Sequence, residues 1–283
     1  MIGCSAPQEN KETKDYSNAH VSYLGPSGTY TEEACEHFFE NKGSYIPYQS
    51  VNEVIDALIS NETEYAVIPQ ENTIGGAVID YVDLIIEKKE LAVVGEVELI
   101  IKQNLLANKD ATLSDIKTVY SHSQGLLQGK DWLNENLPDA ELITVSSTAE
   151  AARLVKEEND ISKAAIASLK SSEVYDLKIL AESIQNNDSN KTRFYVLSIE
   201  EPSTINNDRL AFIASGKAEE LPDLMSRIDD LKMKLITIHD RPLKSELGEY
   251  YYIIECVSDY SQYEKLIRNS SFTFRYLGSF DLR

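Results

Sequence analysis

The sequence HVSYLGPSGTYT, at residues 20–31, sets the fold class that this chain is expected to adopt. An apolar run from His20 to Leu24 predicts a short strand, and the glycines and proline at 25–28 predict the turn that ends it. An amphipathic segment of helix length follows, and apolar runs and amphipathic stretches continue to alternate as far as Ile199. This order of elements predicts an α/β fold.

The composition changes along the 283 residues, which are more than one hydrophobic core usually organises. Residues 1–19 are polar and predict a flexible leader, residues 20–199 carry the α/β pattern, and residues 200–208 predict a linker. In residues 209–283 the expected order is strand, helix, strand, strand, helix, strand. This βαββαβ order is typical of a ferredoxin-like domain.

The formal net charge of −20 argues against nucleic acid and anionic membrane surfaces as partners, because both require patches of Lys and Arg. An acidic protein that binds an anionic substrate must gather its few cations at the site. Arg193 and Arg241, which lie within polar motifs, are therefore of interest. No apolar stretch of about 18 residues is present, so no membrane span is expected.

The three cysteines, Cys4, Cys35 and Cys256, are far apart and lack metal-ligand spacing, which predicts reduced structural thiols and no metal site. The segment around Cys4 resembles the end of a lipoprotein signal, but the apolar segment that should precede it is absent. We therefore expect a cytoplasmic protein. Lipid anchoring through Cys4 is the alternative if a signal segment is missing from this chain.

Three polar motifs follow predicted strands, and a fourth is a polar loop that leads into one. Any one of them has an ordinary structural interpretation, as a turn, a helix cap or a hydrogen-bonded histidine. Together, without a metal spacing, a nucleotide fingerprint or a Ser-His-Asp order, they favour a site that holds a small polyanion and supplies hydroxyl donors. The four motifs are GPSGTY at 25–30, PQENTIGG at 69–76, SHSQ at 121–124 and NKTRF at 190–194.

The order YLGPSGTYTEEA, YAVIPQENTIGGAV, SHSQGLLQ, SSTAEAA and NKTRFYVL, over residues 20–200, resembles the prephenate dehydratase family. The departures are Thr73 for the family's Ser, Ser123 for Pro and Gly125 for Ala. The resemblance implies a catalytic domain of two lobes, like those of periplasmic binding proteins, with prephenate bound between them. It implies no cofactor, and a homodimer or homotetramer.

The resemblance also implies roles for single residues. Thr192 matches the family's catalytic threonine, and its weakly acidic hydroxyl is interpreted as a hydrogen-bond donor to the departing oxygen. Arg193 is expected to hold a substrate carboxylate, and Phe194 to form an apolar wall. The full set of expected substrate-binding residues is Thr29, Asn72, Thr73, Ser121, Gln124, Thr148, Arg193 and Phe194.

The C-terminal part resembles an ACT regulatory domain, which in this family binds phenylalanine through GAL and ESRP boxes. Both boxes are altered here, to Glu219–Leu221 and His239–Pro242. Glu219 adds bulk and negative charge where the family has glycine, so inhibition by phenylalanine stays open. The candidate effector residues are Leu221, Asp240, Arg241 and Pro242.

Two alternative functions remain at this point. An arogenate dehydratase would act on the amino analogue of prephenate, and a non-enzymatic two-lobed solute-binding protein would share the architecture. A chorismate mutase domain is not expected, because the sequence before Tyr23 is too short for its helices.

Overall fold

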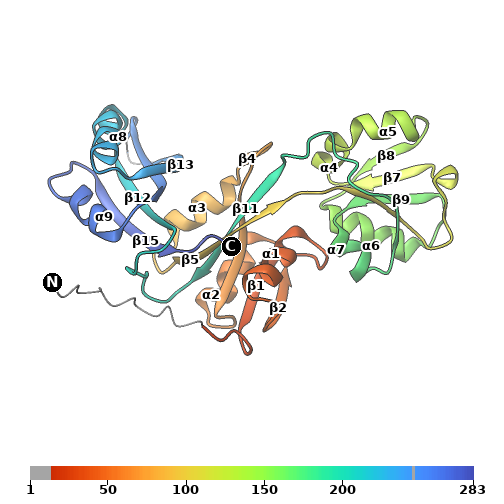
Figure 1. The fold of residues 1–283 in the computed structure, drawn as a ribbon, viewed down its shortest axis with the longest axis horizontal. Helices are drawn as coiled ribbons and strands as arrows, with labels where there is room; N and C mark the ends of the chain where they lie inside the picture. Colours follow the sequence, from red (N-terminus) through yellow and green to blue (C-terminus); the bar gives the residue numbers. More distant parts are fainter. Residues whose placement is uncertain (1–13, 244–245) are drawn as a thin grey trace, which may run out of the picture.

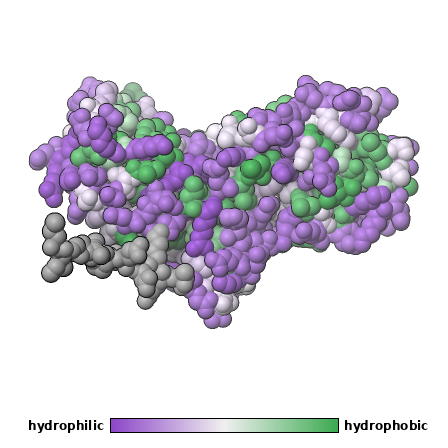
Figure 2. Space-filling model, in the orientation of Figure 1, coloured by the Kyte–Doolittle hydropathy of each residue, from purple (hydrophilic) through white to green (hydrophobic). Residues whose placement is uncertain are grey.

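The computed structural model describes residues 14–243 and 246–283, which form three units in an elongated row (Figure 1). A first lobe occupies the middle, a second lobe lies at one end and the C-terminal domain at the other. Cys4 lies outside the described residues. Within those residues, no helix has the length and apolar character needed to cross a membrane. Hydrophilic residues cover most of the face in Figure 2, as the strongly negative composition leads one to expect.

The first lobe is a mixed sheet with helices packed against it. β1 is parallel to β2 and β3, whereas β11 is antiparallel to both β3 and β5. The strand order is β2 (Ser44–Tyr48), β1 (His20–Leu24), β3 (Tyr65–Asn72), β11 (Lys191–Ser198) and β5 (Ala92–Ile100), with β4 (Gly76–Ala77) paired to β3; the helices are α1 (Tyr30–Phe38), α2 (Val51–Ile59) and α3 (Ile79–Glu87).

The second lobe is inserted between β5 and β11, so the chain crosses between the lobes twice (Figure 1). The short strands β6 and β10 were absent from the sequence-based expectation. The strand order is β10 (Lys178–Ala181), β6 (Asn104–Ala107), β9 (Lys163–Ala167), β7 (Thr118–Ser121) and β8 (Glu141–Thr144); the helices are α4 (Ser123–Gln128), α5 (Lys130–Asn136), α6 (Thr148–Glu158) and α7 (Leu169–Val174), with a 3-10 turn at Leu113–Asp115.

The C-terminal domain has the predicted βαββαβ order and an antiparallel sheet, so the predicted fold class is confirmed: two lobes followed by a ferredoxin-like domain. The sheet order is β13 (Lys234–Pro242), β14 (Glu249–Val257), β12 (Arg209–Lys217) and β15 (Thr273–Phe280); the helices are α8 (Leu221–Asp230) and α9 (Tyr260–Ile267), and a 3-10 turn covers Ala218–Glu220.

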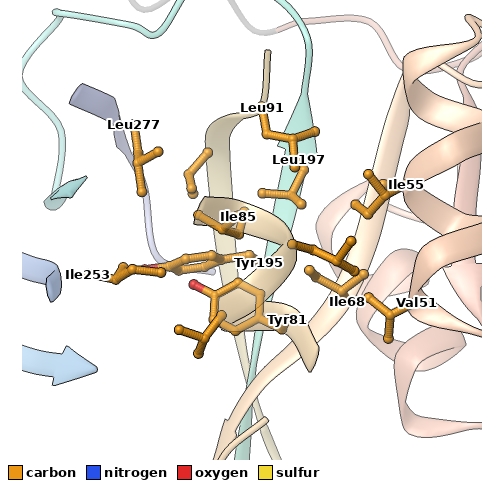
Figure 3. Packing of buried hydrophobic residues seen from close by; sticks show 14 of the residues in the cluster. Val51, Ile55, Ile68, Tyr81, Ile85, Leu91, Tyr195, Leu197, Ile253 and Leu277 are labelled. Carbon is orange, nitrogen blue, oxygen red and sulfur yellow. The ribbon is translucent and has the colours of Figure 1, made fainter. Parts of the chain in front are cut away.

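The C-terminal sheet buries both of its faces. Phe212 and Ile254 face a core that α8 and α9 complete, whereas Ile213 and Ile253 point to the other side, as strand alternation requires. There they join one hydrophobic cluster with Tyr195 and other first-lobe residues (Figure 3). The first lobe and the C-terminal domain therefore share a core and dock by apolar burial, which is the main favourable term in such contacts.

The chain segments around these domains are also held in place. Tyr16 lies in the segment expected to be a flexible leader, yet it is buried, with its ring edge against Phe39 at a centroid distance of 4.9 Å. In the expected linker, the Ser203 carbonyl accepts hydrogen bonds from the Ser279 N–H at 2.9 Å and the Tyr276 hydroxyl at 3.0 Å. Tyr16 at the end of the expected leader and Ser203 in the expected linker thus both contact the folded domains.

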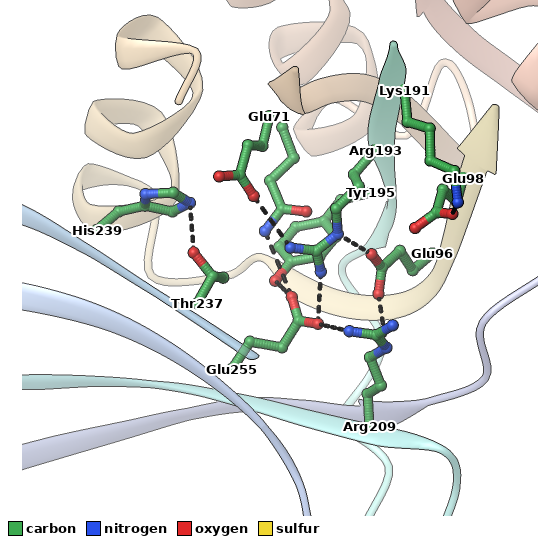
Figure 4. A network of polar contacts seen from close by, with 11 residues as sticks. Glu71, Glu96, Glu98, Lys191, Arg193, Tyr195, Arg209, Thr237, His239 and Glu255 are labelled. Atoms are coloured by element: carbon green, nitrogen blue, oxygen red, sulfur yellow. Dashed lines mark hydrogen bonds and ion pairs between the residues drawn. The ribbon is translucent and has the colours of Figure 1, made fainter. Parts of the chain in front are cut away.

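An ion cluster is buried where the C-terminal domain meets the first lobe (Figure 4). We call Glu96, Arg193, Arg209 and Glu255 the interdomain ion cluster. Arg193 Nη2 lies 2.5 Å from Glu255 Oε1, and Arg193 Nε contacts Glu96. Arg209 reaches the same two carboxylates, at 2.9 Å from Glu255 and 3.3 Å from Glu96. Both carboxylates are fully buried, so each depends on the guanidinium groups for its charge to be tolerated.

The two carboxylates respond differently to this environment. Burial, followed by repulsion from Glu255, raises the pKa of Glu96 to about 7. Burial also opposes ionisation of Glu255, but Arg193 and the Tyr195 hydroxyl outweigh it and lower the pKa of Glu255. Glu96 is thus the member of the cluster that exchanges a proton near neutral pH.

We predict that Glu96 makes the protein less stable as pH rises. Its folded-state pKa lies above its ordinary value of 4.5, so the folded protein holds a proton that the unfolded chain has lost, and stability falls between about pH 4.5 and 7. Glu96→Gln removes this effect. The unfolding free energy of the wild type relative to the variant should fall by about 3 kcal/mol across that window, measured by urea unfolding on either side of it. A difference that does not change with pH would contradict this environment for Glu96.

Candidate functional site

Thr192 lies on β11, paired with Asn72 of the neighbouring strand β3. The Asn72 side-chain amide donates a hydrogen bond from Nδ2 to Thr192 Oγ1 at 2.8 Å. Both residues were expected in loops at strand ends, but they belong to the strands themselves. The sheet therefore fixes the backbone that carries the threonine hydroxyl.

The orientation of the Asn72 amide follows from its other contacts. Its Oδ1 accepts the backbone N–H groups of Ile74 at 2.9 Å and Gly75 at 3.0 Å, so its Nδ2 must face Thr192. Thr192 Oγ1 is thereby the acceptor in their hydrogen bond. Among the described residues, the Thr192 hydroxyl proton has no hydrogen-bond acceptor.

Thr73 and Asn190 complete what we call the threonine cluster, which consists of Asn72, Thr73, Asn190 and Thr192. Asn190 Oδ1 accepts hydrogen bonds from Thr73 Oγ1 at 3.1 Å and Asn72 Nδ2 at 3.0 Å. Thr73 Oγ1 in turn accepts the backbone N–H of Lys191 at 3.0 Å. These bonds tie the β3–β4 turn to the start of β11.

Asn190 belongs to the NKTRF motif but was not among the residues expected to form the site. Its side chain is fully buried, and its Nδ2 has no hydrogen-bond partner among the described residues. A buried donor without a partner is costly and is uncommon in folded proteins. Asn190 directly precedes β11 and lies two residues before Thr192. In extended backbone this spacing places both side chains on one side of the chain, and it is the sequence signal that could have identified Asn190.

Gln124 brings the second lobe to this cluster. It lies in the first turn of α4, and a methyl group placed on Gly75 would come within 2.9 Å of Gln124 Nε2 and 3.8 Å of Asn72 Oδ1. The absence of a side chain at Gly75 is what allows this approach. The structure thus brings Asn72, Thr73, Gln124 and Thr192 together between the two lobes.

Ser121 and Thr148 lie deeper in the second lobe, beneath α4. Ser121 is fully buried and donates a hydrogen bond to the Ile166 carbonyl at 2.8 Å. A methyl group on Gly125 would clash with Ser121 Oγ and would lie 3.3 Å from Thr148 Cγ2. These contacts give Ser121 and Thr148 a part in supporting α4 and hence Gln124.

Thr29 caps the N-terminus of α1. Its hydroxyl accepts the Glu32 N–H at 3.4 Å and donates to the Leu24 carbonyl at 3.3 Å. The loop before it contacts the second lobe, because the Gly28 carbonyl accepts hydrogen bonds from Ser168 at 2.7 Å and Ser171 at 2.8 Å. The GPSGT motif therefore joins the two lobes.

Arg193 and Phe194 have surroundings that differ from those expected. Arg193 points away from the threonine cluster, where its guanidinium pairs with Glu96 and Glu255 and lies 3.2 Å from Glu71 (Figure 4). It is held by carboxylates of the protein itself instead of facing a substrate carboxylate. Phe194 is 1% exposed and packs in the first-lobe core, so it is not the wall of an open cleft. Alternation along β11 accounts for the separation of Thr192 from Arg193.

The candidate effector residues lie in the C-terminal domain. Arg241 makes a bidentate ion pair with Asp83 of α3, at 2.5 and 2.8 Å. Arg241 and Pro242 line a cavity of about 280 Å³ that also contacts α3, while Asp240 precedes them on β13. Leu221 packs against the core of the domain. The altered Glu219 lines a second cavity of about 340 Å³.

Comparisons with known proteins place this site in a family. Residues 21–202 match the family model described as prephenate dehydratase. The chain is 35% identical, over 83% of its length, to a bifunctional chorismate mutase/prephenate dehydratase of Neisseria gonorrhoeae, and it spans 65% of that relative. It is 30% identical to the prephenate dehydratase of Bacillus subtilis, over 83% of this chain and 87% of that one.

A solved structure of prephenate dehydratase from Arthrobacter aurescens, in complex with L-Phe, matches 93% of this chain and 90% of its own. Its TM-score is 0.82 at 28% identity, and the match includes the C-terminal domain as well as both lobes. The family model, the relatives and the solved structure all point to the family that the motifs around Thr192 resemble. The chain belongs to the prephenate dehydratase family.

Proposed function

We propose that this chain is a prephenate dehydratase, a carbon–oxygen lyase that converts prephenate to phenylpyruvate, water and carbon dioxide. The observation that carries the proposal is the hydrogen bond from Asn72 to Thr192, which makes the threonine oxygen an acceptor and leaves its proton for a substrate. Family membership supplies the reaction, and the threonine cluster supplies a group suited to it. A solute-binding protein would have no need for a hydroxyl aimed in this way.

The reaction breaks two bonds that join the ring of prephenate to its substituents, the C–C bond to the ring carboxylate and the C–O bond to the ring hydroxyl. The bond to the ring carboxylate breaks, carbon dioxide leaves, and the electron pair forms the aromatic ring as the hydroxyl departs. The Thr192 O–H donates a hydrogen bond to that oxygen as negative charge develops, and the oxygen leaves as water after taking up a proton from solvent. Positioned assistance of this kind is worth a rate factor of about 10² to 10⁴.

The surrounding residues divide into two roles in this mechanism. Thr192 and Gln124, from opposite lobes, contact the substrate, while Asn72 and Thr73 orient the threonine. Arg193 lies behind the strand and acts on the site through β11, since its guanidinium is held by protein carboxylates. This role differs from the one that the family resemblance implies, in which Arg193 binds a substrate carboxylate directly.

We predict that Thr192→Val lowers kcat for prephenate by a factor of about 10² to 10⁴. Thermal stability should change little, because the side chains are nearly isosteric and Asn72 Nδ2 keeps Asn190 Oδ1 and the Lys191 carbonyl as acceptors when the threonine oxygen is removed. Thr192→Ser is the matched control and should keep most of the activity. Purified protein is incubated with prephenate and with arogenate, and phenylpyruvate and phenylalanine are measured separately.

The two products identify the substrate. Phenylpyruvate from prephenate supports the proposal, and faster phenylalanine formation from arogenate would assign the alternative substrate. Binding without turnover of either compound would indicate a solute-binding protein. Near-normal turnover by Thr192→Val would remove the hydroxyl from the mechanism.

We further propose that the C-terminal domain is an ACT domain, that it acts in a homodimer or homotetramer, and that its affinity for phenylalanine is reduced. The Arthrobacter aurescens enzyme was solved in complex with L-Phe, which supports phenylalanine as the ligand to test on this chain. In this chain, Glu219 places a carboxylate at the 340 Å³ cavity, and Arg241 is paired with Asp83. Both features disfavour a ligand carboxylate at the two altered boxes.

We predict that Glu219→Gly strengthens phenylalanine binding by about tenfold, which corresponds to about 1.4 kcal/mol. Calorimetric titration of both proteins measures the change, with D-phenylalanine as the control ligand. Tight binding by the wild type, unchanged in the variant, would show that Glu219 does not weaken the site.

A further inference from the structure

We propose that Glu255 of the C-terminal domain is a positioning residue for Thr192, and that it acts through Arg193. This inference rests on the proposed function, because it assigns Glu255 to the same reaction. It implies that the catalytic strand acquires its working geometry only when the C-terminal domain is docked on the first lobe.

Arg193 directly follows Thr192, and three strands hold its guanidinium. Glu71 comes from β3, Glu96 from β5 and Glu255 from β14 (Figure 4). The first two belong to the same sheet as β11, so they restrain the arginine within the lobe. Glu255 is the carboxylate that reaches it from another domain.

Glu255 contacts two residues of β11, Arg193 and Tyr195, which lie on the side of the strand that faces the C-terminal domain. Its Oε1 lies 2.5 Å from Arg193 Nη2, and its Oε2 accepts the Tyr195 hydroxyl at 2.6 Å. Thr192 and Phe194 point to the opposite side of the strand. Contacts that restrain the side chains of Arg193 and Tyr195 therefore also restrain the backbone that carries Thr192.

The strand is irregular at this position. The pairing of β11 with β3 matches Thr192 to Asn72 and Arg193 to Glu71, and its register then shifts between Arg193 and Phe194. Bulges of this kind bend a strand and change the direction of the adjacent side chain, and they are frequent next to active sites. Arg193, whose side chain contacts Glu255, thus lies at this register shift, directly next to the Thr192–Asn72 pair.

The charge balance makes Glu255 suitable for a test by substitution. Arg193 and Arg209 carry the positive charges, and Glu96, Glu255 and Glu71 surround them. Neutralising Glu255 leaves two carboxylates for two guanidinium groups, so neither cation is left buried without a counter-charge. The expected consequence is a loosened Arg193 in a protein that still folds.

The experiment compares Glu255→Gln with Arg275→Gln in the full chain. Arg275 also links the C-terminal domain to the first lobe, by hydrogen bonds to the carbonyls of Ile85 and Lys88 in and after α3, and among the described residues it has no hydrogen bond or ion pair with β11. We expect Glu255→Gln to lower kcat for prephenate at least tenfold, with KM within about threefold. Arg275→Gln should keep kcat within about twofold of the wild type. Equal losses in the two variants would mean that Glu255 contributes only to docking.

A double-mutant cycle separates positioning from general damage. If Glu255 acts through Thr192, then Glu255→Gln should have little further effect on kcat in the Thr192→Val background. Losses that multiply in the double variant would overturn the inference. Glu255→Asp, which keeps the charge but withdraws the carboxylate from Arg193, gives the same test with less disturbance and should also lower kcat.

The outcomes distinguish the two proposals. Wild-type levels of turnover in Glu255→Gln, together with loss of turnover in Thr192→Val, would reject the positioning role and leave the proposed function intact. Absence of prephenate turnover in the wild type would instead reject the proposed function, and with it the inference.

Discussion

The structure depends on one constraint, which is that the charge of Arg193 is buried where strand β11 of the first lobe meets the C-terminal domain. A guanidinium in such a place must be matched by carboxylates, and Glu96, Glu255 and Glu71 provide them from three different strands. The apolar cluster that includes Tyr195, Ile253 and Leu277 joins the same two domains, and the side chains of Glu96 and Glu255 have no exposed surface. The ion pair between Glu255 and Arg193 consequently both docks the C-terminal domain and restrains β11.

On the other side of β11, the proposed mechanism relies on neutral groups. Asn72 is oriented by two backbone N–H groups, and it passes that orientation to the Thr192 hydroxyl. Preorganised donors of this type stabilise developing charge without having to reorganise during the reaction. Gln124 reaches the same place from the second lobe, so the site is complete only when both lobes are in position. On one side of β11, Arg193 pairs with buried carboxylates, and on the other side Thr192 contacts the neutral side chain of Asn72.

Much of this could be predicted from the sequence, because apolar alternation and strand-end motifs are local signals. The α/β pattern, the βαββαβ order and the gathering of residues 72, 73, 124 and 192 follow from such signals together with the family resemblance. The carboxylate partners of Arg193 could not be predicted from the sequence because they are distant along the chain: Glu96 and Glu255 lie 97 and 62 residues away. Likewise, Tyr16 is buried by a tertiary contact with Phe39 that the polar composition around it conceals.

The central claim is that Asn72 leaves the Thr192 proton free by donating to the threonine oxygen. Turnover of prephenate by Asn72→Asp tests it most directly, since a carboxylate oxygen in place of Nδ2 would accept the threonine proton instead. Our account predicts that kcat falls about as far as it does when the hydroxyl itself is removed, in a variant shown to be folded at the assay temperature. A variant with wild-type kcat would contradict it.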